Sequence, residues 1–155
     1  MIRKACLISA VIATTATASP FAVEHIIIET PVEMRRAEGI ALGPYGGALE
    51  GVRVRVFDRP ELLFDYKTPW VEAEKLRHKL REQTTKADGR FRFDLPPGKY
   101  EVRLTKDEAV FDPLSFVLVV GKGASRQGVC VYMKPESGPG GTVEQCDIAH
   151  PPDKQ

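Results

Sequence analysis

Two tight-turn signals lie close together in residues 86–104, which read KADGRFRFDLPPGKYEVRL. Asp88 and Gly89 predict a hairpin turn, because glycine accepts the positive φ that a tight turn between twisted strands requires. The Pro-Pro-Gly run that ends at Pro97 and Gly98 predicts a second reversal, since proline presets φ and glycine again tolerates the corner. A chain that turns twice over so few residues forms short strands here.

The residues between and after these turns alternate between apolar and charged side chains. Alternate residues of a strand point to opposite faces, so one set predicts a buried face. A symmetric second loop would place Phe93 opposite Tyr100 and Arg92 opposite Glu101 in a three-stranded meander. The expected inward side chains are Phe91, Phe93, Tyr100, Val102 and Leu104.

Further strands are predicted on both sides of this segment. LSFVLVV is apolar on both faces and therefore belongs in the middle of a sheet, whereas GVCVYMK places Val129 inward and Cys130 outward. Short strands joined by turns predict an all-β fold, an antiparallel β-sandwich of about seven strands. The further strands are GVRVRVF (51–57), LSFVLVV (114–120), GVCVYMK (128–134) and EHIIIE (24–29), the last being either a strand or an extended arm.

One helix is expected, over residues 69–82, within an insertion at 58–83. Thr68 followed by Pro69 has the pattern of an N-cap and a first helical residue. Ala73, Leu76 and Leu80 then recur at helical spacing on one side.

The two ends of the chain differ in composition from its middle. A basic start, a short apolar run and an Ala-Thr-Ala motif predict a secretory signal peptide over residues 1–18, with cleavage after Ala18, or alternatively after Ala22. Residues 19–38 would form an N-terminal arm or first strand, and the Pro- and Gly-rich residues 135–155 a tail. The mature protein is then expected to be secreted or periplasmic, with no transmembrane segment.

The net charge indicates which partners the protein can bind, and the cysteines are interpreted from the compartment to which it is exported. Loss of Arg3 and Lys4 with the signal leaves 20 basic against 21 acidic residues, a net charge of −1 that makes nucleic acid an unsuitable partner. Cys130 and Cys146 would remain as an even pair in an oxidising compartment, which favours a disulfide over two free thiols.

The turn and strand residues together resemble the carboxypeptidase regulatory-like domain, a transthyretin-like (prealbumin-like) β-sandwich. The resemblance covers roughly residues 39–134, although Ala48 replaces a frequent proline and the insertion at 58–83 is longer than usual. It implies an exported accessory module, and the wider fold class includes carbohydrate-binding domains. The matching residues are Gly47, Leu49, Gly51, Val52, Val54, Thr85, Gly89, Phe91, Phe93, Leu95, Pro96, Gly98 and Tyr100. The turn residues Asp88 and Pro97 complete the fold motif.

Two features of the sequence are candidates for binding: the arginines expected to point outward from the strands, and a tryptophan in the insertion. The outward arginines could dock an acidic protein or polysaccharide, or they could form a solvated sheet surface interleaved with Glu101 and Asp94. Trp70, the only tryptophan, could be a packing anchor or a platform for a sugar ring. The outward arginines are Arg53, Arg55, Arg90, Arg92 and Arg103.

No motif in the chain predicts catalysis. The G-x-S-x-G and H-E-x-x-H patterns are missing, the histidines are scattered, and the C-terminal Pro-Asp-Lys-Gln differs from the ending of transthyretin-related hydrolases. We therefore expect no catalytic residues, no metal site and no cofactor. The leading expectation is a non-catalytic binding or structural module with an unknown protein or polysaccharide partner at the cell envelope. A carbohydrate-binding module comes second and a small hydrolase third.

Overall fold

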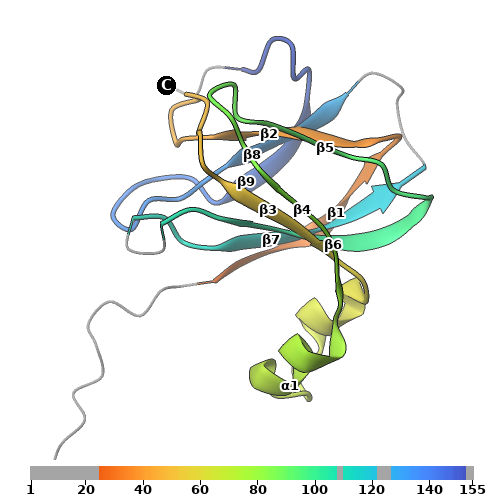
Figure 1. The fold of residues 1–155 in the computed structure, drawn as a ribbon. Coiled ribbons are helices and arrows are strands. Elements are labelled where there is room, and N and C mark those ends of the chain that lie inside the picture. The colour runs from red at the N-terminus through yellow and green to blue at the C-terminus, as the bar shows by residue number, and fades with distance from the viewer. Residues whose placement is uncertain (1–24, 108–109, 122–126, 153–155) are drawn as a thin grey trace, which may run out of the picture.

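Two β-sheets packed face to face form the body of the protein (Figure 1). The computed structural model describes residues 25–107, 110–121 and 127–152. The five-stranded sheet has the order β1 (Ile26–Met34), β7 (Leu114–Val120), β6 (Gly98–Thr105), β3 (Arg53–Phe57), β4 (Lys79–Thr84). The four-stranded sheet has the order β5 (Arg90–Phe93), β2 (Ala37–Leu42), β8 (Gly128–Tyr132), β9 (Thr142–Cys146). The predicted β-sandwich with one inserted helix is confirmed, with nine strands in these ranges.

Each sheet contains one parallel pair among antiparallel neighbours. β1 runs parallel to β7, and β2 runs parallel to β8. The consecutive strands β1 and β2 lie in different sheets, so they cannot pair with each other. Each pairs instead with a strand from the C-terminal half of the chain, which fastens the N-terminal segment into both sheets.

The core lies between the sheets and is built by the alternation seen in the sequence. Val54 of β3, Val102 of β6 and Leu118 of β7 point inward from one sheet, and Phe91 and Val131 point inward from the other. As predicted, β7 is central and buried along its whole length. Burial on both faces of β6 and β8 shows that the outer face of each sheet is covered at these strands.

The two turns of the opening motif do not form hairpins within one sheet. β4 lies in the five-stranded sheet, β5 in the four-stranded sheet and β6 in the five-stranded sheet again, so both turns carry the chain across the sandwich. The expected pairing was therefore wrong: Phe93 pairs with Ala37, and Tyr100 pairs with Leu118. The alternation of apolar and charged residues could not reveal this crossing. Phe93 and Tyr100 point into the same core whether their strands pair within one sheet or lie in opposite sheets.

The pairing expected for the charged residues of the meander was wrong for the same reason. Arg92 lies opposite Glu38 of β2, in the four-stranded sheet. Glu101 lies between Phe57 of β3 and Val117 of β7, in the five-stranded sheet.

The turn residues nevertheless have the local roles that the motif implies. Gly51 and Gly89 have φ values of +77° and +69°. The Tyr100 hydroxyl donates a 2.7 Å hydrogen bond to the carbonyl of Pro96, which fixes the Pro-Pro-Gly loop. Thr85 Oγ1 accepts from the Val52 amide at 2.9 Å, linking the loop before β5 to the start of β3.

The helix in the insertion is shorter than expected. The helix α1 spans Trp70–Leu76, a 3-10 helix η1 spans Pro60–Phe64, and the second half of the predicted helix is the strand β4. Residues with good helical spacing form a strand here because β3 offers them an antiparallel partner. Leu76 and Leu80 are accordingly exposed rather than buried.

The predicted N-cap is also wrong. Pro69 occupies the N-cap position of α1, and no side-chain hydrogen bond caps the helix. The Thr68 hydroxyl instead donates to Asp65 Oδ2 at 2.6 Å.

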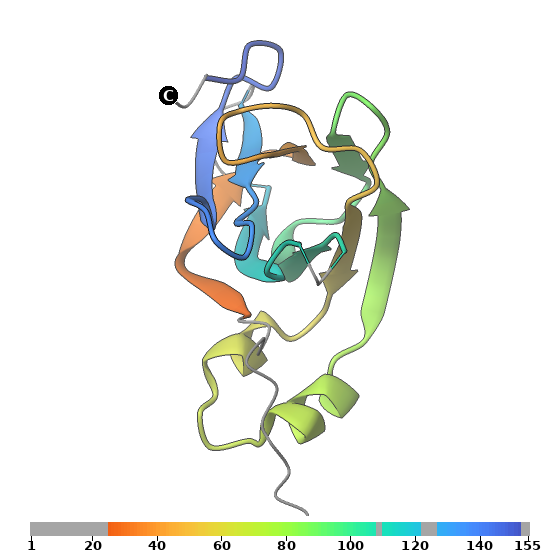
Figure 2. The same ribbon diagram turned by 90° about the vertical axis from the view of Figure 1, so that its left-hand side faces the viewer.

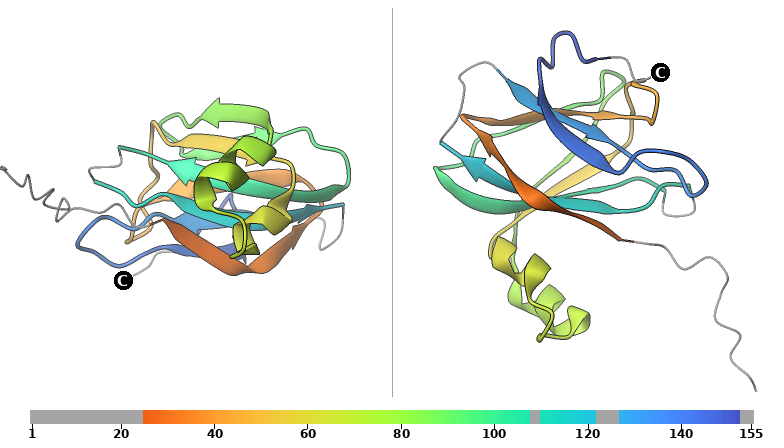
Figure 3. Two further views of the ribbon diagram at one scale, coloured as in Figure 1. Left: turned by 90° about the horizontal axis from the view of Figure 1, so that it is seen from below. Right: turned by 180° about the vertical axis from the view of Figure 1, so that it is seen from behind.

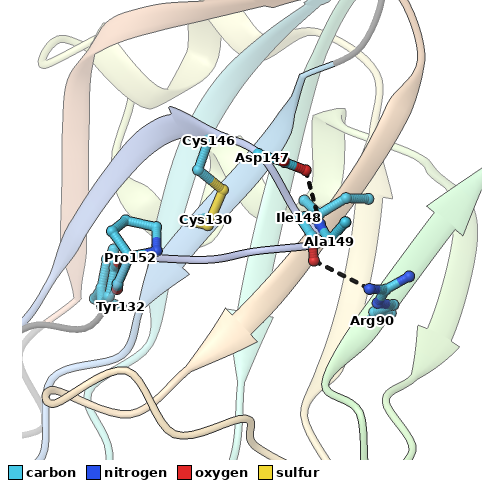
Figure 4. The surroundings of a disulfide bond; sticks show 8 residues. All are labelled: Arg90, Cys130, Tyr132, Cys146, Asp147, Ile148, Ala149 and Pro152. Atoms are coloured by element: carbon cyan, nitrogen blue, oxygen red, sulfur yellow. Dashed lines mark hydrogen bonds between the residues drawn. A yellow bond between two sulfur atoms is a disulfide. The ribbon is translucent and has the colours of Figure 1, made fainter.

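The segment predicted as a tail contains a strand and a cover for the four-stranded sheet. β9 pairs antiparallel with β8, and a disulfide joins Cys130 to Cys146, as predicted (Figure 4). The chain after β9 then folds over the outer face, where Ile148 packs on the Cys130 cluster. Arg90 donates to the Ile148 carbonyl at 3.1 Å, which holds this cover in place.

The predicted signal peptide, residues 1–18, lies outside the described residues, as do residues 19–24 of the arm. Within the described part of the chain, no helix is long and apolar enough to cross a membrane.

Substitution of Gly89 by valine should destabilise the fold by roughly 2–4 kcal/mol. The positive φ disfavours a β-branched residue, and a Cβ at this position would lie 2.6 Å from the Ala41 carbonyl oxygen. Urea unfolding measures the loss. Gly47→Val is the control, because apart from its two chain neighbours no residue has a heavy atom within 4 Å of the Cβ position there. Equal losses in the two variants would contradict the assigned turn.

Candidate functional site

The insertion between β3 and β4 forms a compact lobe on the outer side of the five-stranded sheet. Residues 58–78, called the inserted lobe below, project from one side of the sandwich (Figures 2 and 3). Its two ends meet at Asp58 and His78: the His78 amide donates to Asp58 Oδ1 at 2.7 Å, and its ring Nδ1 lies 3.0 Å from Oδ2. The lobe is therefore a long hairpin connection closed at its neck.

The sheet face beneath the lobe carries charged residues in its centre. The register places Arg55 opposite Arg103, and Arg103 opposite Ser115. On the adjacent row, Glu101 lies between Phe57 and Val117 of the flanking strands. Although this face points away from the core, Glu101 is 0% exposed, because the lobe covers it.

Four charged side chains, three of them buried and Glu74 about one-third exposed, form an ion network between the lobe and the sheet. Arg77, at the C-terminal end of α1, donates to both Glu101 and Glu74. Arg103 donates to Glu101 at 2.9 Å and to Glu74 at 2.8 Å. The two positive and two negative charges balance, so the buried members of the network are not left uncompensated.

The electrostatics of Glu74 follow from these contacts. Burial acts to raise the pKa of its carboxyl, but the hydrogen bond and positive charge of Arg103 outweigh that effect and hold the pKa below its ordinary value.

Aromatic rings enclose the two guanidinium groups of this network. The Trp70 ring centre lies 4.7 Å from Arg77 Cζ and 5.5 Å from Arg103 Cζ. Phe57 contacts Arg103 from the sheet, at 4.9 Å. Trp70 thus covers the ion network on one side, and 43% of its own surface remains exposed. The ring can therefore hold the lobe on the sheet and still offer a surface to a ligand.

His25 extends the network toward the N-terminal end of β1. Its Nε2 lies 2.8 Å from Ser115 Oγ, and its ring meets Trp70 edge-on at 5.0 Å. Burial disfavours the protonated ring, and the charge of Arg103 opposes it further, so the pKa of His25 falls to about 4. His25 is therefore neutral at pH 7.

His25, Ser115 and Glu101 lie next to one another, but this arrangement does not activate the serine hydroxyl as a nucleophile. Ser115 is fully buried, and its hydroxyl donates to Glu101 at 3.1 Å. The single hydroxyl proton is then engaged, so neutral His25 donates to Ser115 instead of accepting its proton. Activation of a serine requires the opposite direction of transfer.

The five outward arginines do not form one face. Arg90 and Arg92 lie on the four-stranded sheet, whereas the other three lie on the five-stranded sheet. Within that sheet Arg55 and Arg103 are directly opposite each other, so the expected like-charge neighbours exist. Burial lowers the pKa of Arg55, and the nearby charges of Arg103 and Arg53 lower it further.

Reasoning from the sequence missed most of the ion network. Glu101 and Arg103 were assigned to an open surface, and Arg77, Glu74 and His25 received no role there. A usable signal existed: charged residues on the outward phase of a central strand require a cover, and Glu74 and Arg77 are three residues apart on the one inserted helix.

Comparison with known proteins returned no matching family model, no similar curated protein and no similar solved structure. Among residues 25–107, 110–121 and 127–152, no three His, Cys, Asp or Glu side chains come together as a group that could hold a metal ion.

Neutralising Glu101 should cost about 3–5 kcal/mol of stability, because Glu101→Gln leaves the buried Arg77 and Arg103 undercompensated. The control is Glu82→Gln on the same sheet, where the carboxylate also contacts two cations, Arg53 and Lys79, but is partly exposed. Its loss should be much smaller, because solvent screens an exposed ion pair. Chemical denaturation of both variants makes the comparison, and a small loss for Glu101→Gln would refute the network as the lobe's anchor.

Stability should fall as the pH drops from about 6.5 to about 4, in part because of His25. The unfolded ring binds its proton near pH 6.5 and the folded ring only near pH 4, so the unfolded state binds more protons in that window. Below pH 4 this effect adds no further loss. Because the ring is half-buried, we expect about 1–3 kcal/mol.

His25→Gln isolates this contribution. Glutamine keeps a hydrogen-bond donor for Ser115 and does not titrate. Urea unfolding at pH 7 and pH 4.5 should show a smaller drop in the variant than in the parent protein. Identical drops would show that His25 is already protonated in the fold or is solvated like an ordinary histidine.

Proposed function

We propose that this protein is an exported, non-catalytic binding module whose inserted lobe docks a protein partner at the cell envelope or outside the cell. The supporting observation is the lobe's outward surface. Tyr66 is 87% exposed, Val71 67% and Leu76 42%, beside the half-exposed Trp70. All four residues lie within 66–76 of the lobe. Tyrosine and tryptophan are enriched in protein interfaces, and several exposed hydrophobic side chains on one short segment favour a docking role.

The lobe's construction suits this role. Two of its charged side chains, Glu74 and Arg77, pair with Arg103 and Glu101 of the sheet, whereas most of the others and several apolar side chains face solvent. A lobe fixed by ion pairs loses little conformational freedom on binding, so less of the interaction free energy is offset by ordering.

Export is supported by two features of different kinds. The Cys130–Cys146 disulfide is compatible with an oxidising compartment, since reducing compartments keep such pairs as thiols. The sequence of residues 1–18 has the pattern of a signal peptide.

The resemblance to the carboxypeptidase regulatory-like domain supports an accessory role. Its motif residues act in turns and core packing, as Gly51, Gly89 and Tyr100 do here. Because these positions hold the fold, the proposed binding activity belongs to the insertion that lies outside the motif.

Carbohydrate binding through Trp70 is the second candidate. The ring contacts guanidinium groups and remains 43% exposed, so a sugar ring could stack on its accessible side. We rank the protein partner first because several large hydrophobic side chains of the lobe are exposed, whereas a single accessible aromatic ring supports the sugar platform.

A photo-crosslinking residue in place of Tyr66, in the protein exported by its native host, tests the proposal. We expect a covalent adduct with a defined partner protein from position 66. The control is the same residue in place of Tyr45, which is 67% exposed and follows β2 of the four-stranded sheet, whereas the lobe joins two strands of the five-stranded sheet. Val71→Glu should remove the adduct at 66 without lowering the melting temperature, because Val71 is exposed.

Other outcomes would change the conclusion. Equal adducts from positions 66 and 45, or none from 66, would contradict the lobe as a docking surface. Glycan binding that is lost in Trp70→Ala and kept in Val71→Glu would favour the carbohydrate module instead.

A further inference from the structure

A second surface lies where the chain passes from β1 to β2. Arg35 and Arg36 form this connection, and Arg92 stands on the neighbouring strand β5. The pairing of Ala37 with Phe93 brings the start of β2 beside the end of β5, so the three arginines meet. Together they line a hollow of about 630 Å³ with Ala37, Phe93, Asp94 and Leu95.

The charges of this hollow are not balanced within the described part of the chain. Its lining residues include three arginines and one acidic residue, Asp94. Arg53, Arg77 and Arg103 each pair with a glutamate, whereas none of Arg35, Arg36 and Arg92 has a carboxylate within 4 Å among the described residues. Glu38, directly opposite Arg92 on β2, also forms no ion pair with it.

We propose that this hollow, called the arginine hollow below, binds an acidic segment of a partner protein. A guanidinium group matches a carboxylate with two parallel hydrogen bonds, and three such groups fit several carboxylates along one chain. Phe93 is only 8% exposed, so the hollow offers no open aromatic face on which a sugar ring could stack. The chemistry therefore favours an acidic peptide over an acidic polysaccharide.

This site differs from the inserted lobe in residues and in chemistry. The arginine hollow shares no residue with residues 58–78, and its contacts are ionic rather than apolar. Its binding should weaken steeply as salt is added, because exposed charges are screened.

Fluorescence anisotropy with a labelled hexaglutamate peptide at low ionic strength tests the site. We expect saturable binding to the folded protein, weakened about tenfold or more by Arg92→Glu. The matched control is Arg81→Glu, which makes the same charge change at an exposed arginine of β4, outside the hollow. It should weaken binding about twofold at most. Thermal melting establishes that both variants are folded.

A second measurement locates the peptide directly. Backbone amide NMR shifts on titration should concentrate at residues 35–37 and 92–95. If Arg81→Glu weakened peptide binding as much as Arg92→Glu, or if the shifts spread over the whole surface, binding would depend on overall charge alone. Either result would overturn the proposal. Absence of binding would overturn it too. Binding of hexagalacturonate as tight as that of hexaglutamate would overturn the choice of a peptide.

Discussion

A carboxylate buried on the outer face of the five-stranded sheet determines how the rest of this structure is arranged. Glu101 has no access to water, and a buried charge persists only when it is paired and hydrogen-bonded. Arg103 supplies one cation from the same strand, but Arg77 comes from the end of α1. The inserted helix must therefore sit where its C-terminal arginine reaches β6, which fixes the lobe on the sheet.

This anchoring determines which side chains of the lobe face solvent. Glu74 and Arg77 pair with residues of the sheet, and Trp70 closes over their contacts. Leu62, Leu63 and Ala73 are buried, as ordinary packing requires, and most other charged side chains of the lobe are exposed. The large apolar side chains that remain exposed, such as Tyr66 and Val71, are therefore the ones that internal packing does not explain. The ion network holds the lobe in place while these side chains are open to solvent.

The sequence predicts what depends on alternation and on local turns, and fails where distant segments meet. Phe91, Tyr100 and Val131 point inward as expected, and the disulfide follows from cysteine parity and compartment. Which sheet each strand joins depends on nonlocal pairing, so both crossing turns looked like hairpins. Lys79–Thr84 has an acceptable helical pattern and becomes a strand only because β3 lies beside it. The ion network required knowledge of where the insertion lands, which no local pattern contains.

The arginines show how structure separates two roles that look alike in sequence. Arg53, Arg77 and Arg103 have glutamates of the same chain as partners, so their charges are used within the fold. Arg35, Arg36 and Arg92 meet in a hollow with one carboxylate and remain available. A partner that contacted both this hollow and the inserted lobe would bind the second surface at high effective concentration, because the sandwich holds the two in a fixed relation. Two individually weak surfaces on one rigid scaffold can in this way select a single partner that presents acidic and apolar segments at the matching separation.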